Sequence, residues 1–197
     1  MGIRIPECFM PDNAERKSAE LALLLSFEKF LKEKSPGDNF DIGYQIGERL
    51  AKELKYTKSD LENVVGNLYQ GDDLSKPYVF HKNFLLRFTY EKSIGVYISA
   101  LVNKIIGEYP LNLHIRTLLQ GIGCFQKKGT LVVYGSVGKM AGYKMEGGLL
   151  VINGNTSWGT GYDMTGGKLI VNGTPNHISK SCKGIIYQCD KQVWPAP

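Results

Sequence analysis

The sequence has few of the residues that metal sites and redox centres use. Its 197 residues include three histidines, and its four cysteines form no C-x-x-C pair. Zinc and iron–sulfur sites usually draw their ligands from closely spaced cysteines and histidines. We therefore predict no catalytic, cofactor-binding or metal-binding residue set. The thiols are expected to be reduced and mostly buried, namely Cys8, Cys124, Cys182 and Cys189.

The sequence also lacks a long apolar segment. No run of 18 apolar residues exists, so we predict no membrane-spanning helix and no membrane partner. The first residues, MGIRIPECFMPDNAERK, lack the apolar core and the small-residue cleavage site of a secretory leader. We therefore expect a cytoplasmic protein.

Acidic residues are scarce in the second half of the chain. Residues 109–197 hold nine Lys and Arg against three Asp and Glu, whereas residues 1–108 hold 15 against 16. The change in character falls at Gly107-Glu108-Tyr109-Pro110, a sequence typical of a turn. We therefore predict two domains, a region of unrecognised family over residues 1–108 and a basic domain over residues 109–197.

The first domain is expected to be mainly helical. Apolar residues recur at helical spacing over residues 12–34 and 41–55. Thr57-Lys58-Ser59-Asp60 has the form of a capping box that opens a third helix. Phe84–Tyr90 is strand-like in composition, and Ser93–Ile106 is expected to form the last helix. These apolar positions indicate a core and do not indicate a ligand.

The second domain contains a repeat of 19 residues. Gln126–Lys144, Met145–Asp163 and Met164–Cys182 align without gaps. A fixed period near 20 with one short β-branched segment in each copy is typical of a parallel β-solenoid. Glycine, leucine and β-branched residues occupy the shared columns, which are Gly129/Gly148/Gly167, Leu131/Leu150/Leu169, Val133/Ile152/Val171, Gly135/Gly154/Gly173 and Gly142/Gly161.

Alternation along each strand divides the apolar residues between two faces. If Leu150 and Ile152 point into the solenoid, the residue between them points outward. The same logic places Val132, Val151 and Ile170 in one outward apolar ridge, which we expect the helices of the first domain to cover.

Glycines are expected to form the corners of the coils at positive φ. This prediction applies in particular to Gly154 and Gly173.

The ends of the repeat are degenerate. Leu111–Ile115, followed by Gly121 and Gly123, has the form of an imperfect first coil, and Lys183–Tyr187 begins a further row two residues early. Short solenoids need caps at their ends. We expect the helical domain and the tail at Val193-Trp194-Pro195 to serve as caps.

The repeat resembles a known domain. Met145–Gly154 and Met164–Gly173 both fit the pattern M-x-G-G-x-[IL]-x-[VI]-x-G, which resembles the GXGXG domain over about residues 120–190. That domain forms the C-terminal right-handed β-helix of the large glutamate synthase polypeptide and much of a structural subunit of formylmethanofuran dehydrogenase. The first row departs from the pattern at Gln126 and Lys128, and Thr174–His177 replaces the usual glycine-bearing turn. The expected fold class is α+β, a mainly helical N-terminal half packed on a short right-handed parallel β-helix with 19-residue coils.

The resemblance implies a structural role. In both families the β-helix is a scaffold, and the catalytic chemistry takes place in other domains or polypeptides. By this resemblance the chain is expected to be a non-catalytic assembly protein, a subunit or accessory of a larger redox or amidotransferase-type enzyme complex. It would bind a protein partner or a further copy of itself. An acidic partner would explain the basic charge of residues 109–197.

A nucleic-acid-binding role is the first alternative. Tyr143 and Tyr162 would offer stacking beside a basic face, although the lysines fall in several columns of the repeat. These lysines are Lys127, Lys128, Lys139, Lys144, Lys168, Lys180 and Lys183.

An enzyme acting on a polysaccharide is the second alternative. It would use acids on the solenoid face, and residues 109–197 offer only Glu146, Asp163 and Asp190. Glu146 and Asp163 fall near the same corner of adjacent coils, where a pair is conceivable, but both are expected to be solvated corner residues. The glycines at 135–140 and 159–164 lack the remaining residues of nucleotide-binding motifs.

Overall fold

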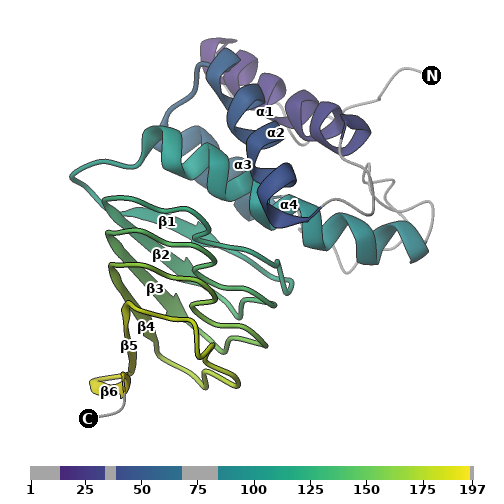
Figure 1. The fold of residues 1–197 in the computed structure, drawn as a ribbon. Helices are drawn as coiled ribbons and strands as arrows, with labels where there is room; N and C mark the ends of the chain where they lie inside the picture. The colour runs from purple at the N-terminus through teal and green to yellow at the C-terminus, as the bar shows by residue number, and fades with distance from the viewer. Residues whose placement is uncertain (1–13, 34–38, 68–83, 196–197) are drawn as a thin grey trace.

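The structure is a computed structural model that describes residues 14–33, 39–67 and 84–195 (Figure 1). Within these ranges the helices precede the strands in the sequence, and none of the helices is long and apolar enough to cross a membrane. The helices are α1 (Ala14–Glu33), α2 (Phe40–Glu53), α3 (Lys58–Asn67) and α4 (Phe84–Ile105). The strands are β1 (Leu111–His114), β2 (Thr130–Tyr134), β3 (Leu149–Asn153), β4 (Lys168–Val171), β5 (Ile185–Gln188) and β6 (Lys191–Trp194).

The helices pack around the ring of Tyr97 in α4. This ring stacks on Phe30 with 4.6 Å between ring centroids and meets Phe27 edge-on at 4.9 Å. Its hydroxyl donates a hydrogen bond of 2.7 Å to Oγ of Ser26, so the one polar atom of the ring is satisfied. Aromatic pairs of this kind stabilise a core by about 0.5–1.5 kcal/mol beyond their area. They join α1 to α4.

The predicted helices of the first domain are confirmed in order, and the last of them begins earlier than predicted. The backbone N–H of Ile42 donates to the side chain of Asn39, which caps α2. Thr57 and Asp60 form the expected capping box before α3: the N–H of Thr57 donates to the Asp60 carboxylate at 2.8 Å, and the N–H of Asp60 donates to Thr57 Oγ1 at 3.2 Å. The predicted start of the first helix at residue 12 lies outside the described residues.

The strand predicted at Phe84–Tyr90 is wrong. These residues are the first turns of α4, which runs without a break from Phe84 to Ile105. Helix propagation adds one hydrogen bond for each residue that is fixed. A segment adjoining a strongly helical sequence therefore extends that helix, even where its aromatic residues have a preference for strands.

The strands form one sheet in sequence order, and β1 to β5 are parallel. Leu131 lies opposite Leu150, and Leu150 lies opposite Leu169, so the coil length is the predicted 19 residues. From β4 to β5 the coil shortens by two residues, as the early row at Lys183 indicated, because Leu169 lies opposite Ile186. The predicted fold class, a helical half packed on a short parallel β-helix, is confirmed.

The predicted inward columns are buried. Leu131, Leu150 and Leu169 have no exposed surface, and the neighbouring column of Val133, Ile152 and Val171 has none either. These side chains belong to one continuous apolar core that extends from the helices into the solenoid. Gln126, which departs from the repeat, lies in the same buried part of the coil as Met145 and Met164.

Two glycine columns form corners at positive φ, as predicted. Gly129, Gly148 and Gly167 have φ values of 69°, 78° and 84°, and Gly142 and Gly161 have values of 66° and 67°. Only glycine adopts this left-handed region without steric cost.

The prediction of positive φ at Gly154 and Gly173 is wrong, because neither residue is in that region. These residues are glycine because the coils approach each other closely. A Cβ on Gly154 would lie 2.5 Å from the carbonyl oxygen of Gly135, and one on Gly173 would lie 2.6 Å from that of Gly154.

Both ends of the solenoid are capped. The helices lie over the end that carries β1 (Figure 1), where α4 contacts the turn at residues 120–124 and α3 packs against β1. At the other end β6 reverses direction and pairs with β5. The indole N–H of Trp194 donates to the carbonyl oxygen of Cys182 at 2.8 Å, so the predicted tail closes this end.

The close approach of the coils predicts the effect of an added methyl group. Gly154→Ala should lower the free energy of unfolding by about 1–3 kcal/mol, because its Cβ would overlap the backbone of Gly135 and Ser136. Gly66→Ala is the matched control: a Cβ there meets nothing within 4 Å, and alanine favours α3 by about 0.5–1 kcal/mol. Urea denaturation of both variants measures the difference, and equal stability would contradict the close approach.

Candidate functional site

The outer face of the sheet carries a continuous apolar surface. Successive strands place Val132, Val151, Ile170 and Tyr187 opposite one another. These residues alternate with the buried inward columns, so their side chains point away from the solenoid interior. The outward assignment of the valine and isoleucine ridge is therefore confirmed, and all four side chains are partly exposed.

The ridge is wider than the sequence indicated. Leu149 and Ile185 lie beside it at the start of their strands, and Tyr134 lies on the far side at the end of β2. Ile185 is 43% exposed and Tyr134 is 42% exposed, which is unusual for such large apolar groups. We call these residues together the outer face, defined as Val132, Tyr134, Leu149, Val151, Ile170, Ile185 and Tyr187.

The prediction that the helices cover the ridge is wrong. The helices lie across the end of the solenoid, and the outer face runs along its side (Figure 1). The end of a solenoid presents a free strand edge together with apolar side chains of the interior, and solenoids therefore need a cap there. The helical domain therefore covers the end, and within the described residues the outer face has no such cover.

Basic side chains accompany the outer face. The ammonium of Lys168 lies over the ring of Tyr187 at 4.0 Å from its centroid, a cation–π contact within the face. Lys127, Lys128 and Lys183 are exposed in the turns just before β2 and β5. The starts of these strands are therefore positively charged.

Two lysines of the solenoid are already paired. Lys127 forms an exposed ion pair of 3.4 Å with Glu146. Lys144 pairs with Asp41 of α2 at 2.8 Å, and this hydrogen bond raises the pKa of Lys144. Because Lys144 sits in the solenoid and Asp41 in the helical domain, their ion pair joins the two domains.

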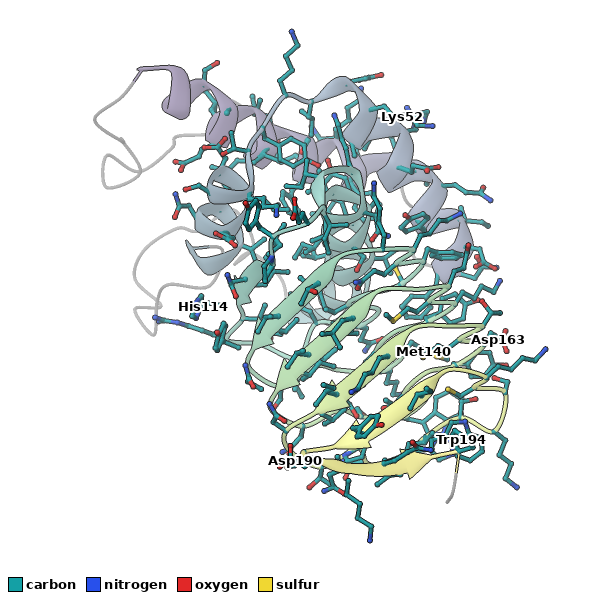
Figure 2. All side chains as sticks on the ribbon, turned by 90° about the vertical axis from the view of Figure 1, so that its left-hand side faces the viewer. Lys52, His114, Met140, Asp163, Asp190 and Trp194 are labelled. Atoms are coloured by element: carbon teal, nitrogen blue, oxygen red, sulfur yellow. The ribbon has the colours of Figure 1, made fainter. Side chains whose placement is uncertain are left out.

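Two of the acids considered for an enzyme, Asp163 and Asp190, lie apart (Figure 2). Glu146 pairs with Lys127, and Asp163 lies in a corner at φ 53° where its N–H donates to Ser181. Figure 2 shows Asp163 and Asp190 at opposite sides of the solenoid. A glycosidase needs two carboxylates about 5–10 Å apart across one substrate bond. Asp163 and Asp190 do not have this arrangement.

The tyrosines considered for nucleic-acid stacking stack on protein groups. The rings of Tyr143 and Tyr162 lie 5.9 Å apart, and Tyr143 also contacts Phe40 and Phe125. Tyr162 contacts Trp158, which stacks on His177 at 5.2 Å. These rings form an aromatic ladder along the corner of the coils, and neighbouring side chains occupy part of the surface that a base would need.

The described thiols are free and do not approach a metal-binding arrangement. Cys124 and Cys182 are buried and Cys189 is exposed, while Cys8 lies outside the described residues. In the ranges that the structure describes, no three His, Cys, Asp or Glu side chains are close enough to hold a metal ion. Burial disfavours the charged thiolate, which raises the pKa of Cys124 to about 12 and also raises that of Cys182.

Comparison with known proteins adds no relative. No family model, no curated protein and no solved structure matches this chain.

The difference in burial between Cys189 and the two buried cysteines, Cys124 and Cys182, predicts selective alkylation. Treatment of the folded protein with iodoacetamide at pH 8 should modify Cys189 and leave Cys124 and Cys182 unmodified, because only an accessible thiolate reacts. Peptide mass spectrometry reads each site, and denatured protein serves as the control in which all three react. Modification of Cys124 at the rate of Cys189 would contradict the burial of the first coil.

Proposed function

We propose that this chain is a non-catalytic assembly protein whose outer face binds a protein partner. The observation that carries the proposal is the partly exposed apolar surface of Val132, Val151 and Ile170 together with the exposed side chains of Tyr134 and Ile185 beside it. A contiguous apolar patch surrounded by polar residues is a feature of interaction sites.

The size of the outer face limits the kind of partner. The outer face lies on four strands, β2 to β5, which at about 4.8 Å apart span about 14 Å, and each contributes a little over 10 Å of length. This area is well below the roughly 800 Å² that each partner buries in a standard interface. The partner must therefore extend beyond the apolar residues to the surrounding lysines.

Charge favours a different protein over a second copy of this chain. Residues 109–197 carry nine basic and three acidic residues, and Glu146 is already paired. Two copies facing each other would bring two basic surfaces together, which opposes association. An apolar surface surrounded by acidic residues is complementary to the outer face and to Lys128, Lys168 and Lys183 around it.

The repeat sequence supports a place in a larger enzyme complex. The resemblance to the GXGXG domain links this type of β-helix to scaffolds of redox and amidotransferase-type enzymes, where it separates and holds catalytic parts. In this proposal the resemblance narrows the partner to a subunit or domain of such an enzyme.

A charge placed in the outer face should abolish binding without unfolding the protein. Val151→Asp puts a carboxylate at the centre of the face, where a partner would bury it at a cost of several kcal/mol. Val151 is only partly buried, so the melting temperature should change little. The measurement is parallel affinity purification from the native cell with quantitative mass spectrometry, beside the melting temperature of each variant.

Lys139→Glu is the control for charge, because Lys139 is exposed and lies outside the strands. The proposal expects an acidic protein that the parent and Lys139→Glu both retain and that Val151→Asp loses by at least about tenfold, or about 1.4 kcal/mol. Equal retention by all three forms would contradict the proposal. A parent that is dimeric by light scattering and becomes monomeric as Val151→Asp would instead identify a second copy as the partner.

A further inference from the structure

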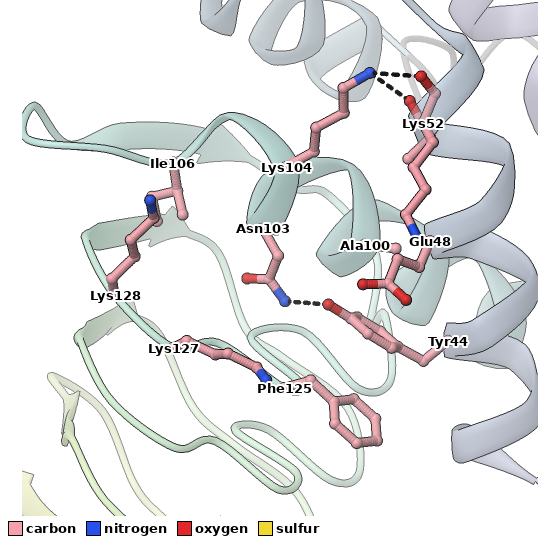
Figure 3. Close-up of a pocket in the computed structure, with 11 residues that line it drawn as sticks. Tyr44, Glu48, Lys52, Ala100, Asn103, Lys104, Ile106, Phe125, Lys127 and Lys128 are labelled. Atoms are coloured by element: carbon pink, nitrogen blue, oxygen red, sulfur yellow. Dashed lines mark hydrogen bonds between the residues drawn. The ribbon is translucent and has the colours of Figure 1, made fainter.

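A cavity lies where the helical domain meets the first coil of the solenoid. Its volume is about 250 Å³, and it opens between α2, α4 and the turn at residues 125–128 (Figure 3). The residues that line it come from both domains and are Tyr44, Glu48, Ala51, Lys52, Ala100, Asn103, Lys104, Ile106, Phe125, Lys127 and Lys128.

The cavity occupies the place that a preceding coil would fill. In the second and third coils the corresponding residues are Gly147 and Gly166, whose Cβ atoms would lie 2.4 and 2.5 Å from carbonyl oxygens of the coil before. The first coil, which contains β1, has no coil before it. Its residue in the same column as Gly147 and Gly166 is Lys128. The departure from the repeat at Lys128 therefore coincides with the cavity that Lys128 lines.

One wall of the cavity presents a fixed acceptor and a fixed donor. The side-chain amide of Asn103 donates to the Tyr44 hydroxyl at 2.8 Å (Figure 3). It also donates to the carbonyl oxygen of Cys124 at 3.0 Å. These bonds use both amide hydrogens, and Oδ1 of Asn103 accepts no hydrogen bond from the described residues. The Tyr44 hydroxyl accepts a hydrogen bond from Asn103. Its own proton has no acceptor among the described residues.

The Tyr44 hydroxyl stays protonated at neutral pH. Burial raises the pKa of Tyr44 to about 12, so the group remains a hydrogen-bond donor. The ring of Tyr44 stacks on Phe125 with 4.4 Å between centroids, which fixes the position of the hydroxyl. A ligand therefore meets a donor and an acceptor side by side, held in place by packing and by the amide of Asn103.

The charge around the cavity favours an anion. Four lysines and one glutamate line it, which gives a net charge of +3. Lys104 donates hydrogen bonds to the carbonyl oxygens of Ala51 and Leu54 at the end of α2, and Lys127 forms an ion pair with Glu146. Lys52 and Lys128 form no ion pair within the described residues, so their ammonium groups can bind an incoming carboxylate.

We infer that this cavity binds a small hydroxycarboxylate. Its carboxylate would accept a hydrogen bond from the Tyr44 hydroxyl, its hydroxyl would donate to Oδ1 of Asn103, and the Lys128 ammonium in the same lining would attract its negative charge. Its carbon chain would lie against Ala100 and Ile106. A cavity of 250 Å³ is smaller than the roughly 300–1,000 Å³ of sites for drug-sized ligands. It therefore suits a molecule of on the order of ten non-hydrogen atoms.

L-malate is the probe, and succinate, which lacks the hydroxyl, is the matched control ligand. Titration of the full chain followed by amide NMR should show saturable shifts around residues 44, 103 and 125–128. Succinate should bind at least about fivefold more weakly, because Oδ1 of Asn103 then has no donor. Binding should also raise the melting temperature, since the ligand contacts both domains.

Two variants test the residues, with Lys139→Gln as the control lysine. Lys128→Gln should weaken malate binding at least about fivefold without affecting the fold, because Lys128 is exposed. Tyr44→Phe keeps the stack on Phe125 and should weaken binding by a similar factor.

Three results would overturn the inference. They are no saturable malate binding at millimolar concentration, equal affinity for succinate, and a Lys128→Gln affinity equal to that of the parent and of Lys139→Gln. Each is read from the same titrations.

Discussion

The structure depends on the contact between α4 and the first coil of the solenoid. Each later coil lies on the backbone of the coil before it, and the first coil lies on a helix. Gly95 of α4 lets the chain approach so closely that a Cβ there would lie 1.9 Å from the carbonyl oxygen of Gln120. The Ser99 hydroxyl lies 2.9 Å from the carbonyl oxygen of Gly121 and accepts the N–H of Gly123 at 3.0 Å. Helix side chains thus make hydrogen bonds that a preceding coil would otherwise supply.

The same contact decides which surfaces stay open. An open end of the solenoid would expose the apolar side chains of the interior and a free strand edge, so the end needs a cover. Once α4 occupies the end, the outer face along the side has no helix against it in the described structure. The helix also fits the first coil imperfectly, because a helix and a coil differ in shape. The cavity beside Asn103 and Lys128 lies in this mismatch. Both candidate binding surfaces therefore follow from how the solenoid begins.

The sequence predicted those features that repeat from coil to coil. Leu131, Leu150 and Leu169 align because a parallel ladder places equal positions above one another, and a fixed period reveals this directly. Features that depend on a neighbouring element were missed. Gly154 was assigned a positive φ, but its need for glycine comes from the backbone of the coil before it, which the period alone does not locate. The prediction that the helices cover the ridge was wrong for the same reason, because the period of the repeat does not show where the helices pack.

The cavity could be predicted only in part. Lys128 breaks the repeat, and that break was visible in the sequence as a departure from the glycine column. Its meaning needed the position of α2 and α4, which brings Tyr44 and Asn103 to the same place from distant parts of the chain. No spacing in the sequence relates these residues. A break in a repeat next to a domain boundary is therefore a useful signal of a site.

Hydrogen–deuterium exchange of Gly95→Val tests most directly whether the solenoid depends on its helical cap. The side chain of valine would push α4 away from Gln120, whereas Gly66→Val in α3 has free space and serves as the control. The account predicts that amides of the first coil, such as Gly121, Gly123 and Phe125, lose protection in Gly95→Val and keep it in Gly66→Val. Unchanged protection of these amides in Gly95→Val would show that the first coil is stable without α4, and would contradict the account.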